Sequence, residues 1–190
     1  KAYSVFNIDQ TEGLSEKYQA PSATAPTVRE NARHENADRF IANTNAEVSH
    51  GGDRACYSPV EDRIYMPSME RFKDSDSYYA VLLHELTHYT MREGRCPRKF
   101  RSSISGIANY AREELIAELG AAFLCADLQV SLTPRPDHAE YIASGLEVLR
   151  SDKRAVFQAA ATAQRATDFL HLLQHLEAKE NSGEVIRKIA

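Results

Sequence analysis

The spacing of hydrophobic and polar positions is typical of α-helices over three long stretches in the second half of the chain. It predicts one helix at about 76–93, a second at about 110–129, and two further helices within 136–179 that meet near Ser151 and Asp152. Residues 74–77 are suited to cap the first helix, and Gly94 is suited to stop it. No proline lies beyond the first position of any stretch, so each helix can run without interruption.

The first half of the chain changes from one helical stretch to short strand-like runs. Residues 28–44 have a helical pattern, whereas residues 47–66 contain short runs of β type. The run Arg63–Met66 alternates in polarity and is followed by Pro67, a pattern typical of an edge strand. A small, mostly antiparallel sheet of three strands beside several helices predicts an α+β fold.

The length of 190 residues predicts one domain with an arm rather than two full domains. Residues 1–27 end in a stretch of small residues and prolines, which predicts an N-terminal arm or linker. The domain itself is expected at 28–180 and a C-terminal tail at 181–190. The chain begins at Lys1 with no signal-peptide pattern, so we expect a processed product or a piece of a longer protein.

Composition excludes several classes of protein. With 43% hydrophobic residues the chain is not disordered, and with a net charge of −4 it is not a basic nucleic-acid binder as a whole. No apolar run reaches the roughly 18 residues that a membrane span needs, so no membrane contact is expected. Three scattered cysteines without a CxxC pair favour a reducing compartment, which predicts a cytoplasmic location.

Residues 84–88 read His-Glu-Leu-Thr-His, an H-E-x-x-H motif in the middle of the first predicted long helix. Positions four apart lie on one helix face, so the imidazoles of His84 and His88 point to one place. Two such nitrogens suit Zn²⁺, and the Glu85 carboxylate beside them can take a proton from metal-bound water. The motif therefore predicts a catalytic metal site with Glu85 as the general base.

A third metal ligand is expected from the second long helix, where Glu113, Glu114 and Glu118 lie. Glu118 is the only charged residue between positions 115 and 126, and a carboxylate there is costly unless it is paired or near a metal. Glu114 lies four residues earlier and shares its helix face. We assign Glu114 as the third ligand and Glu118 as the acceptor of a ligand histidine's free ring N–H. Glu118 or Glu113 as the third ligand remain the alternatives.

Together, the H-E-x-x-H motif and the segment Tyr110–Cys125 resemble the C-terminal zincin-like metallopeptidase domain of ArdC-type antirestriction proteins. Residues 57–67 are similar to the family's strand before the active-site helix, and residues 5–14 to its interdomain junction. The resemblance covers roughly residues 3–175. One departure is Cys96–Arg101, which replaces a shorter turn of the family.

The resemblance implies a gluzincin-like zincin fold and supports Glu114 over Glu113 as the third ligand. Zn²⁺ is the expected cofactor, with Mn²⁺ or another divalent transition metal as the alternative. Full-length members carry an N-terminal domain that binds single-stranded DNA, and that domain is not in this sequence. They are encoded on plasmids and other mobile elements and protect incoming DNA from host restriction. The implied partners are therefore a protein or peptide substrate, single-stranded DNA and the host restriction machinery.

The predicted function is hydrolysis of a peptide bond by metal-activated water, with Glu85 as general base. Tyr110 and Tyr57 are candidate donors to the oxyanion, and the strand Arg63–Met66 is a candidate edge for an extended substrate. One alternative is a binding module in which zinc stabilises the fold and DNA is protected without cleavage. A second alternative is a metal-dependent hydrolase that acts on a non-peptide bond.

Residues 92–101 carry five basic side chains and one phenylalanine. Such a cluster is able to contact nucleic-acid phosphates or an acidic substrate. We interpret it instead as a solvated loop between two helices, the more common role of a charged connection.

Overall fold

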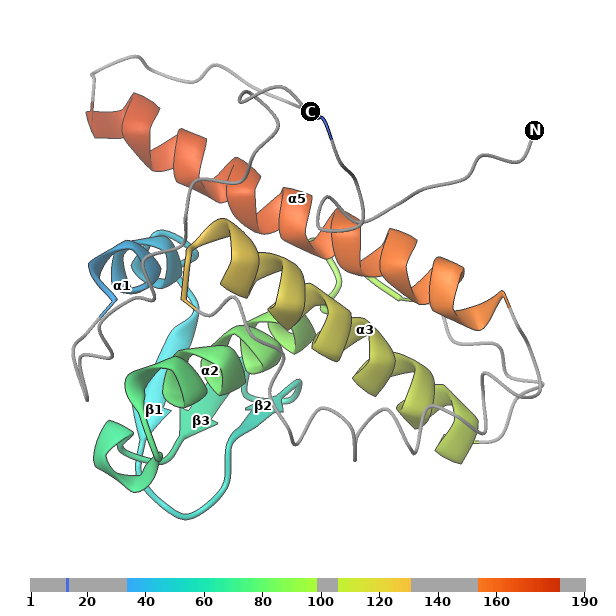
Figure 1. The fold of residues 1–190 in the computed structure, drawn as a ribbon, viewed down its shortest axis with the longest axis horizontal. Helices are drawn as coiled ribbons and strands as arrows, with labels where there is room; N and C mark the ends of the chain where they lie inside the picture. Colours follow the sequence, from blue (N-terminus) through green and yellow to red (C-terminus); the bar gives the residue numbers. More distant parts are fainter. Residues whose placement is uncertain (1–12, 14–33, 99–105, 131–153, 182–190) are drawn as a thin grey trace. The chain divides into compact units, whose positions relative to one another are not determined.

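The computed structural model describes Gly13 and residues 34–98, 106–130 and 154–181 (Figure 1). Among these residues, no helix has the length and apolar character needed to cross a membrane. The predicted arm at 1–27 and the predicted helix break near residue 151 lie outside the described residues, and the proposed domain boundaries remain predictions. In chain order the elements are α1 (Glu35–Ala42), β1 (Glu47–His50), β2 (Cys56–Ser58), β3 (Arg63–Met66), a 3-10 turn (Met69–Arg71), α2 (Ser75–Tyr89), α3 (Gly106–Asp127) and α5 (Ala155–Asn181).

The sheet has three strands in the order β1-β3-β2. Strand β1 runs parallel to β3 and β2 runs antiparallel to it, so that Val48 and Tyr57 both lie beside Ile64. The predicted α+β fold is confirmed, although the sheet is mixed rather than mostly antiparallel. The prediction that residues 63–66 form an edge strand is wrong, because β3 is paired on both sides and Pro67 follows its last residue without removing a ladder hydrogen bond. The edge strand that lies near His84 and His88 of α2 is β2.

Helix α2 begins where the sequence predicts and ends four residues earlier than expected, at Tyr89. The side chain of Asp74 accepts a hydrogen bond of 2.7 Å from the backbone N–H of Ser77, which caps the first turn. One face of the helix packs on the sheet and enters the main core, as its apolar pattern predicts. The buried residues of this face include Tyr79, Leu82, Leu83, Leu86 and Tyr89.

Helix α3 packs against both α2 and α5 (Figure 1). Gly120 faces Thr87 of α2 so closely that a Cβ atom on Gly120 would lie 2.6 Å from Cγ2 of Thr87. There is no room for any side chain at this distance, so only glycine allows the two helices to approach this far. The close approach places the carboxylates of α3 opposite the histidines of α2.

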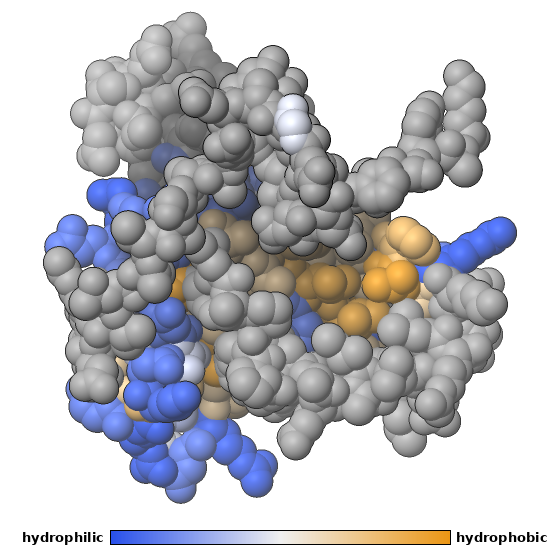
Figure 2. All heavy atoms as spheres, in the orientation of Figure 1, coloured by the Kyte–Doolittle hydropathy of each residue, from blue (hydrophilic) through white to orange (hydrophobic). Residues whose placement is uncertain are grey.

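The buried contact between α3 and α5 is mainly apolar, and an exposed ion pair joins Asp127 at the end of α3 to His171 of α5. Leu115 and Ile116 of α3 form a separate buried cluster with Ala159 and Ala163 of α5. Figure 2 shows apolar side chains gathered over these two helices, whereas polar side chains gather where the sheet lies in Figure 1. Burial of this apolar surface stabilises the pairing of α3 with α5.

The described part of the basic segment after α2 ends at Arg98, and two of its arginines are largely covered, although Arg92 remains exposed. Arg95 donates hydrogen bonds of 2.7 and 2.6 Å to the two carboxylate oxygens of Asp62 and stacks 3.4 Å from the centre of the Tyr89 ring. The Arg98 side chain is only 4% exposed. The predicted solvated loop is therefore wrong for these two arginines, because the fold brings acidic partners to them from distant parts of the sequence. Residues 99–101 lie outside the described residues.

Candidate metal centre

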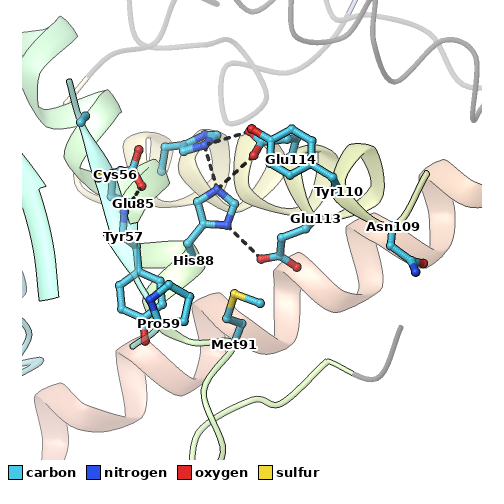
Figure 3. A pocket seen from close by; sticks show the side chains of 12 residues that line it. Cys56, Tyr57, Pro59, Glu85, His88, Met91, Asn109, Tyr110, Glu113 and Glu114 are labelled. Carbon is cyan, nitrogen blue, oxygen red and sulfur yellow. Dashed lines mark hydrogen bonds and ion pairs between the residues drawn. The ribbon is translucent and has the colours of Figure 1, made fainter. Parts of the chain in front are cut away.

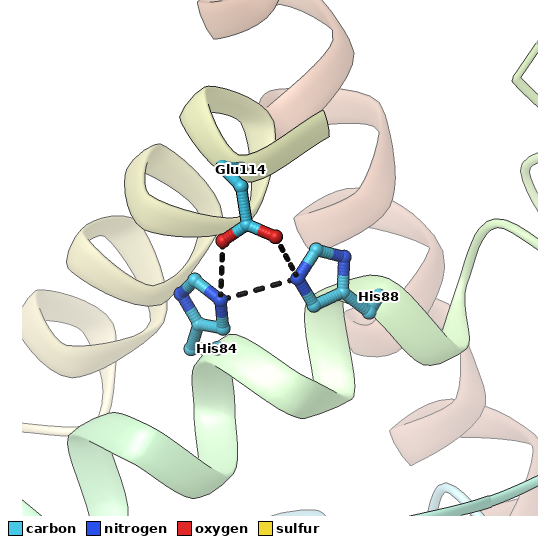
Figure 4. Close-up of side chains that lie close together, drawn as sticks. All are labelled: His84, His88 and Glu114. Carbon is cyan, nitrogen blue, oxygen red and sulfur yellow. Dashed lines mark hydrogen bonds and ion pairs between the residues drawn. The ribbon is translucent and has the colours of Figure 1, made fainter. Parts of the chain in front are cut away.

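His84 and His88 of α2 and Glu114 of α3 turn their donor atoms toward one another (Figure 4). The Nε2 atoms of the two histidines are 3.1 Å apart. Glu114 places Oε2 3.5 Å from Nε2 of His84 and Oε1 3.7 Å from Nε2 of His88. The structure thus brings together the three side chains that the sequence predicts as ligands.

The spacing of these three donors fits a tetrahedral metal ion. Metal–nitrogen and metal–oxygen distances of about 2.0–2.1 Å place neighbouring donors of such an ion about 3.3–3.4 Å apart. The two Nε2 atoms are 3.1 Å apart, and each lies 3.5 or 3.7 Å from a different oxygen of Glu114, so the group is close to this spacing. Two imidazoles and one carboxylate also leave a fourth position open, which is typical of catalytic rather than structural zinc sites.

Each histidine has a carboxylate beside its other ring nitrogen. Nδ1 of His84 lies 3.2 Å from Oε1 of Glu118, and Nδ1 of His88 lies 3.0 Å from Oε1 of Glu113. A proton on Nδ1 then points to a carboxylate and leaves the lone pair of Nε2 free for a cation. The sequence predicts this position for Glu118. Glu113, an alternative ligand from the sequence, instead contacts the side of His88 that faces away from Glu114.

Burial and charge set the protonation of the donor group. Burial alone would lower the pKa of His84, but Glu114 and Glu118 outweigh it and raise that pKa to about 9. Burial alone would raise the pKa of Glu114, but His84 and His88 outweigh it and lower that pKa. Without a cation the group is held together by imidazolium–carboxylate attraction. A divalent cation that binds here therefore displaces a proton.

Glu85 lies in the same pocket and is 7% exposed (Figure 3). Its Oε2 accepts a hydrogen bond of 2.8 Å from the backbone N–H of Tyr57, which belongs to the edge strand β2. Burial raises the pKa of Glu85, while His84 and His88 oppose this shift. A carboxylate with a raised pKa is a stronger base, which suits the role that the motif predicts.

The pocket has a volume of about 460 Å³ and lies between β2, α2 and the first turns of α3 (Figure 3). Tyr110 is 65% exposed at its rim, and a hydrogen bond from Tyr110 contributes to the lowered pKa of Glu114. The hydroxyl of Tyr57 instead donates a hydrogen bond of 2.9 Å to Asp62. Of the two tyrosines considered from the sequence, Tyr57 is thus turned away from the site and Tyr110 lies beside it.

Two contacts of the centre were missed by sequence reasoning. Glu113 holds the far side of His88, and its second oxygen, Oε2, lies 3.3 Å from Nε of Arg98. The basic segment was visible in the sequence, and so were three acidic residues in the next helix. Their pairing was not visible, because it depends on how closely two helices approach.

Comparison with known proteins identifies the class. A family model described as a zincin-like metallopeptidase matches residues 35–162. The chain therefore belongs to the zincin-like metallopeptidase family, as the H-E-x-x-H motif and the donor geometry indicate.

The antirestriction protein ArdC from plasmid R388 is similar in structure. Its Mn(II)-bound crystal structure has a TM-score of 0.70 and 39% sequence identity, over 91% of this chain and 62% of that chain. The metal-free structure has a TM-score of 0.72 and 39% identity, over 92% of this chain and 61% of that chain. The resemblance to ArdC-type proteins is confirmed, and Mn(II) belongs to the class of cofactor that the sequence predicts.

Two curated relatives are longer than this chain. Protein y4eC of Sinorhizobium fredii (strain NGR234) is 44% identical over 181 residues, which cover 95% of this chain and 56% of that protein. The DNA primase TraC of Escherichia coli is 34% identical over 185 residues, which cover 95% of this chain and 16% of that protein. The chain thus spans little more than half of one relative and about a sixth of the other.

Proposed function

We propose that this chain is the catalytic domain of a zinc-dependent metallopeptidase of the antirestriction type. The observation that carries the proposal is the convergence of His84, His88 and Glu114 on one point, with the buried carboxylate of Glu85 in the same pocket. Three ligands with an open fourth position and an adjacent base suit hydrolysis. A purely structural metal would require neither the open position nor Glu85.

His84, His88 and Glu114 would hold a divalent cation, which would supply Lewis acidity to activate a water and polarise a peptide carbonyl. Glu85 accepts the proton of the attacking water and passes it to the leaving amine. The N–H of Tyr57 holds the Glu85 carboxylate in place during both transfers. Tyr110, at the rim, is placed to turn its hydroxyl from Glu114 toward the developing oxyanion and donate a hydrogen bond to it.

An extended peptide substrate would lie along β2 rather than β3. The sequence favoured residues 63–66 as the substrate edge, but β3 has strands on both sides, whereas β2 is an edge strand that lines the pocket. The backbone N–H of Tyr57 donates to Glu85 rather than to β3, so the strand already faces the site at this residue. Edge pairing would fix the direction of the substrate across the metal centre.

The similarity to ArdC suggests a role in protecting incoming DNA from host restriction. Because the chain covers 62% of that ArdC chain, contacts with single-stranded DNA or with the host restriction machinery belong to the proposal for the whole protein. We place this function in the cytoplasm, and the three cysteines, none of them in a disulfide, agree with that location.

The substitution Glu85→Gln tests the proposal. It should leave the metal content and the melting temperature close to wild type and reduce hydrolysis of unfolded protein substrates by at least about 100-fold, because the base is lost. Glu61→Gln, on the exposed turn after β2, is the matched control and should change none of the three.

An antirestriction assay with the full-length protein separates cleavage from binding. If the Glu85→Gln protein still protects DNA, peptide hydrolysis is not the protective activity. The domain would then act as the metal-stabilised binding module that the sequence leaves as the alternative.

A further inference from the structure

Arg98 lies in the basic segment that the proposed mechanism does not use, yet it is the most deeply buried charge of that segment's described part. Its side chain is 4% exposed, against 16% for Arg95 and 43% for Arg92. Its Nη2 donates hydrogen bonds of 3.1 Å to the carbonyl oxygen of Thr87 and 3.0 Å to Oγ1 of Thr90. Both acceptors lie at the end of α2, one residue before His88 and two residues after it. The guanidinium is therefore fixed to the backbone that carries a metal ligand.

Arg98 also reaches the metal centre through Glu113. Its Nε lies 3.3 Å from Oε2 of Glu113, and Oε1 of the same carboxylate lies 3.0 Å from Nδ1 of His88. Glu113 is 6% exposed, so neither group is well solvated. A buried carboxylate without a cationic partner would be costly. The guanidinium thus holds the Glu113 carboxylate in place, with its other oxygen toward Nδ1 of His88.

The number of carboxylates at the centre explains why a cationic side chain such as Arg98 is favourable there. In the described part of the chain, four carboxylates lie around the two histidines: Glu85, Glu113, Glu114 and Glu118. A divalent ion compensates two of these charges, and Arg98 compensates a third. Loss of Arg98 would increase the uncompensated negative charge in a site where water screens little. Glu113 would then be free to turn away or to bind the metal itself.

We propose that Arg98 is a positioning residue of the metal centre, which through Glu113 holds His88 with Nε2 turned toward the cation. The proposal rests on the ligand set of the proposed function. It assigns a role to the basic segment that differs from nucleic-acid contact and from a solvated connection. Groups that contact a ligand directly, as Glu113 contacts His88, typically change metal affinity by about 10- to 100-fold, and Arg98 acts one contact further out, through Glu113.

The test is the affinity of the whole chain for Zn²⁺ in competition with a chelator of known affinity. Arg98→Met should weaken binding by about 10-fold, the lower end of the range for direct partners of a ligand, because Arg98 acts through Glu113. Arg98→Lys keeps the charge but not the forked contacts, and its affinity should fall between those of wild type and Arg98→Met. Arg95→Met is the matched control, since Arg95 is buried in the same segment but pairs with Asp62. It should lower the melting temperature and leave Zn²⁺ affinity within about twofold of wild type.

Two further measurements separate positioning from general loosening of the fold. The visible absorption spectrum of the Co²⁺-loaded chain reports ligand geometry, and it should shift in Arg98→Met but not in Arg95→Met. The Arg98→Met/Glu113→Gln double variant should bind Zn²⁺ no more weakly than Glu113→Gln alone, because Arg98 acts through Glu113.

Each result decides the proposal. Wild-type affinity and spectrum in Arg98→Met would overturn it, and so would an equal loss of affinity in Arg95→Met or additive losses in the double variant. If His84→Ala and Glu114→Ala bind Zn²⁺ as tightly as wild type, the proposed ligand set is overturned as well. If Arg98→Met does not fold, Arg98→Lys decides: wild-type affinity and Co²⁺ spectrum in a folded Arg98→Lys chain overturn the role of the forked contacts.

Discussion

The two sides of helix α3 differ in what they bury. The side toward α2 carries three acidic residues beside the histidines and a glycine at the closest contact. The side toward α5 buries apolar residues packed on alanines, and its ion pair between Asp127 and His171 is exposed. Burial of charge is unfavourable unless partners compensate it, whereas burial of apolar surface is favourable by itself. The residues toward α5 are Leu115, Ile116, Leu119 and Phe123.

This difference separates chemistry from stability on a single helix. The α5 side holds α3 in place whether or not a cation is bound, because its buried contacts are apolar and its ion pair, Asp127–His171, is exposed. The stability of the contact with α2 depends on matched charges and on a close approach of the two helices. A bound metal ion should therefore stabilise this contact more than the contact with α5. We therefore expect substitutions on the two sides to affect different measurements.

The largest effect on folding is expected from Ile116→Ala, on the α5 side. Ile116 is 7% exposed, and truncation of a buried isoleucine costs about 2–5 kcal/mol in the free energy of unfolding. Denaturant titration should show this loss, while Zn²⁺ affinity of the folded chain stays within about twofold of wild type. A parallel loss of affinity would show that the two sides are not separable.

On the α2 side, Glu114→Gln should lower Zn²⁺ affinity by more than about 100-fold, the upper limit for partners that do not touch the metal. Chelator competition measures this loss. Glu118→Gln is the comparison and should lower affinity by only about 10-fold, because Glu118 contacts His84 rather than the ion. The reverse order of the two losses would identify Glu118 as the ligand.

Gly120→Ala should affect both measurements, the stability of the fold and the affinity for Zn²⁺. The added methyl group would lie 2.6 Å from Thr87, and overpacking of this kind costs about 1–3 kcal/mol. The helices must separate, so Zn²⁺ affinity should fall together with the melting temperature. Ala122→Gly, at an exposed position of the same helix, should lower the melting temperature alone. If Gly120→Ala keeps full affinity, the close approach is not what assembles the site.

The smallest effect is expected outside α3, at Asp62. Hydrogen bonds from Arg95, and then from Tyr57 and Arg92, lower the pKa of Asp62 from 3.8 to about 2. Because the folded value is the lower one, the stabilisation is fully present above about pH 4 and is lost as the pH falls toward 2. Asp62→Asn should therefore lower the free energy of unfolding near neutral pH by at most about 2 kcal/mol.

Denaturant titrations at about pH 6 and about pH 2.5 check the effect of Asp62→Asn. The difference between variant and wild type should shrink at the lower pH, and Zn²⁺ affinity at pH 6 should be unchanged. A difference that is equal at both values would show that the charge of Asp62 does not stabilise the fold.

Much of the site was predictable because it depends on one helix at a time. The spacing of His84 and His88 fixes their common face, and Asp74 marks the start of the helix that carries them. The same spacing rule places Glu114 and Glu118 on one face of α3. These rules need only the helix period of about 3.6 residues, so they hold before any tertiary contact forms.

Other features were not predictable from local rules. The central position of β3 depends on which strands pair, and an alternating run followed by proline is compatible with either an edge or a central strand. The burial of Arg98, which lies after the end of α2, depends on Glu113, which is 15 positions away in the sequence and on helix α3. Neither residue type nor periodicity reveals a partner of this kind.

From its amino-acid order alone, the chain defines the helices, the metal-binding motif and the family, because these follow from short-range geometry. The three-dimensional packing sets three neighbouring glutamates against different histidine nitrogens and places Arg98 of the basic segment beside one of them. It does so because the distance and rotation between α2 and α3, permitted by one glycine, determine which carboxylate meets which nitrogen.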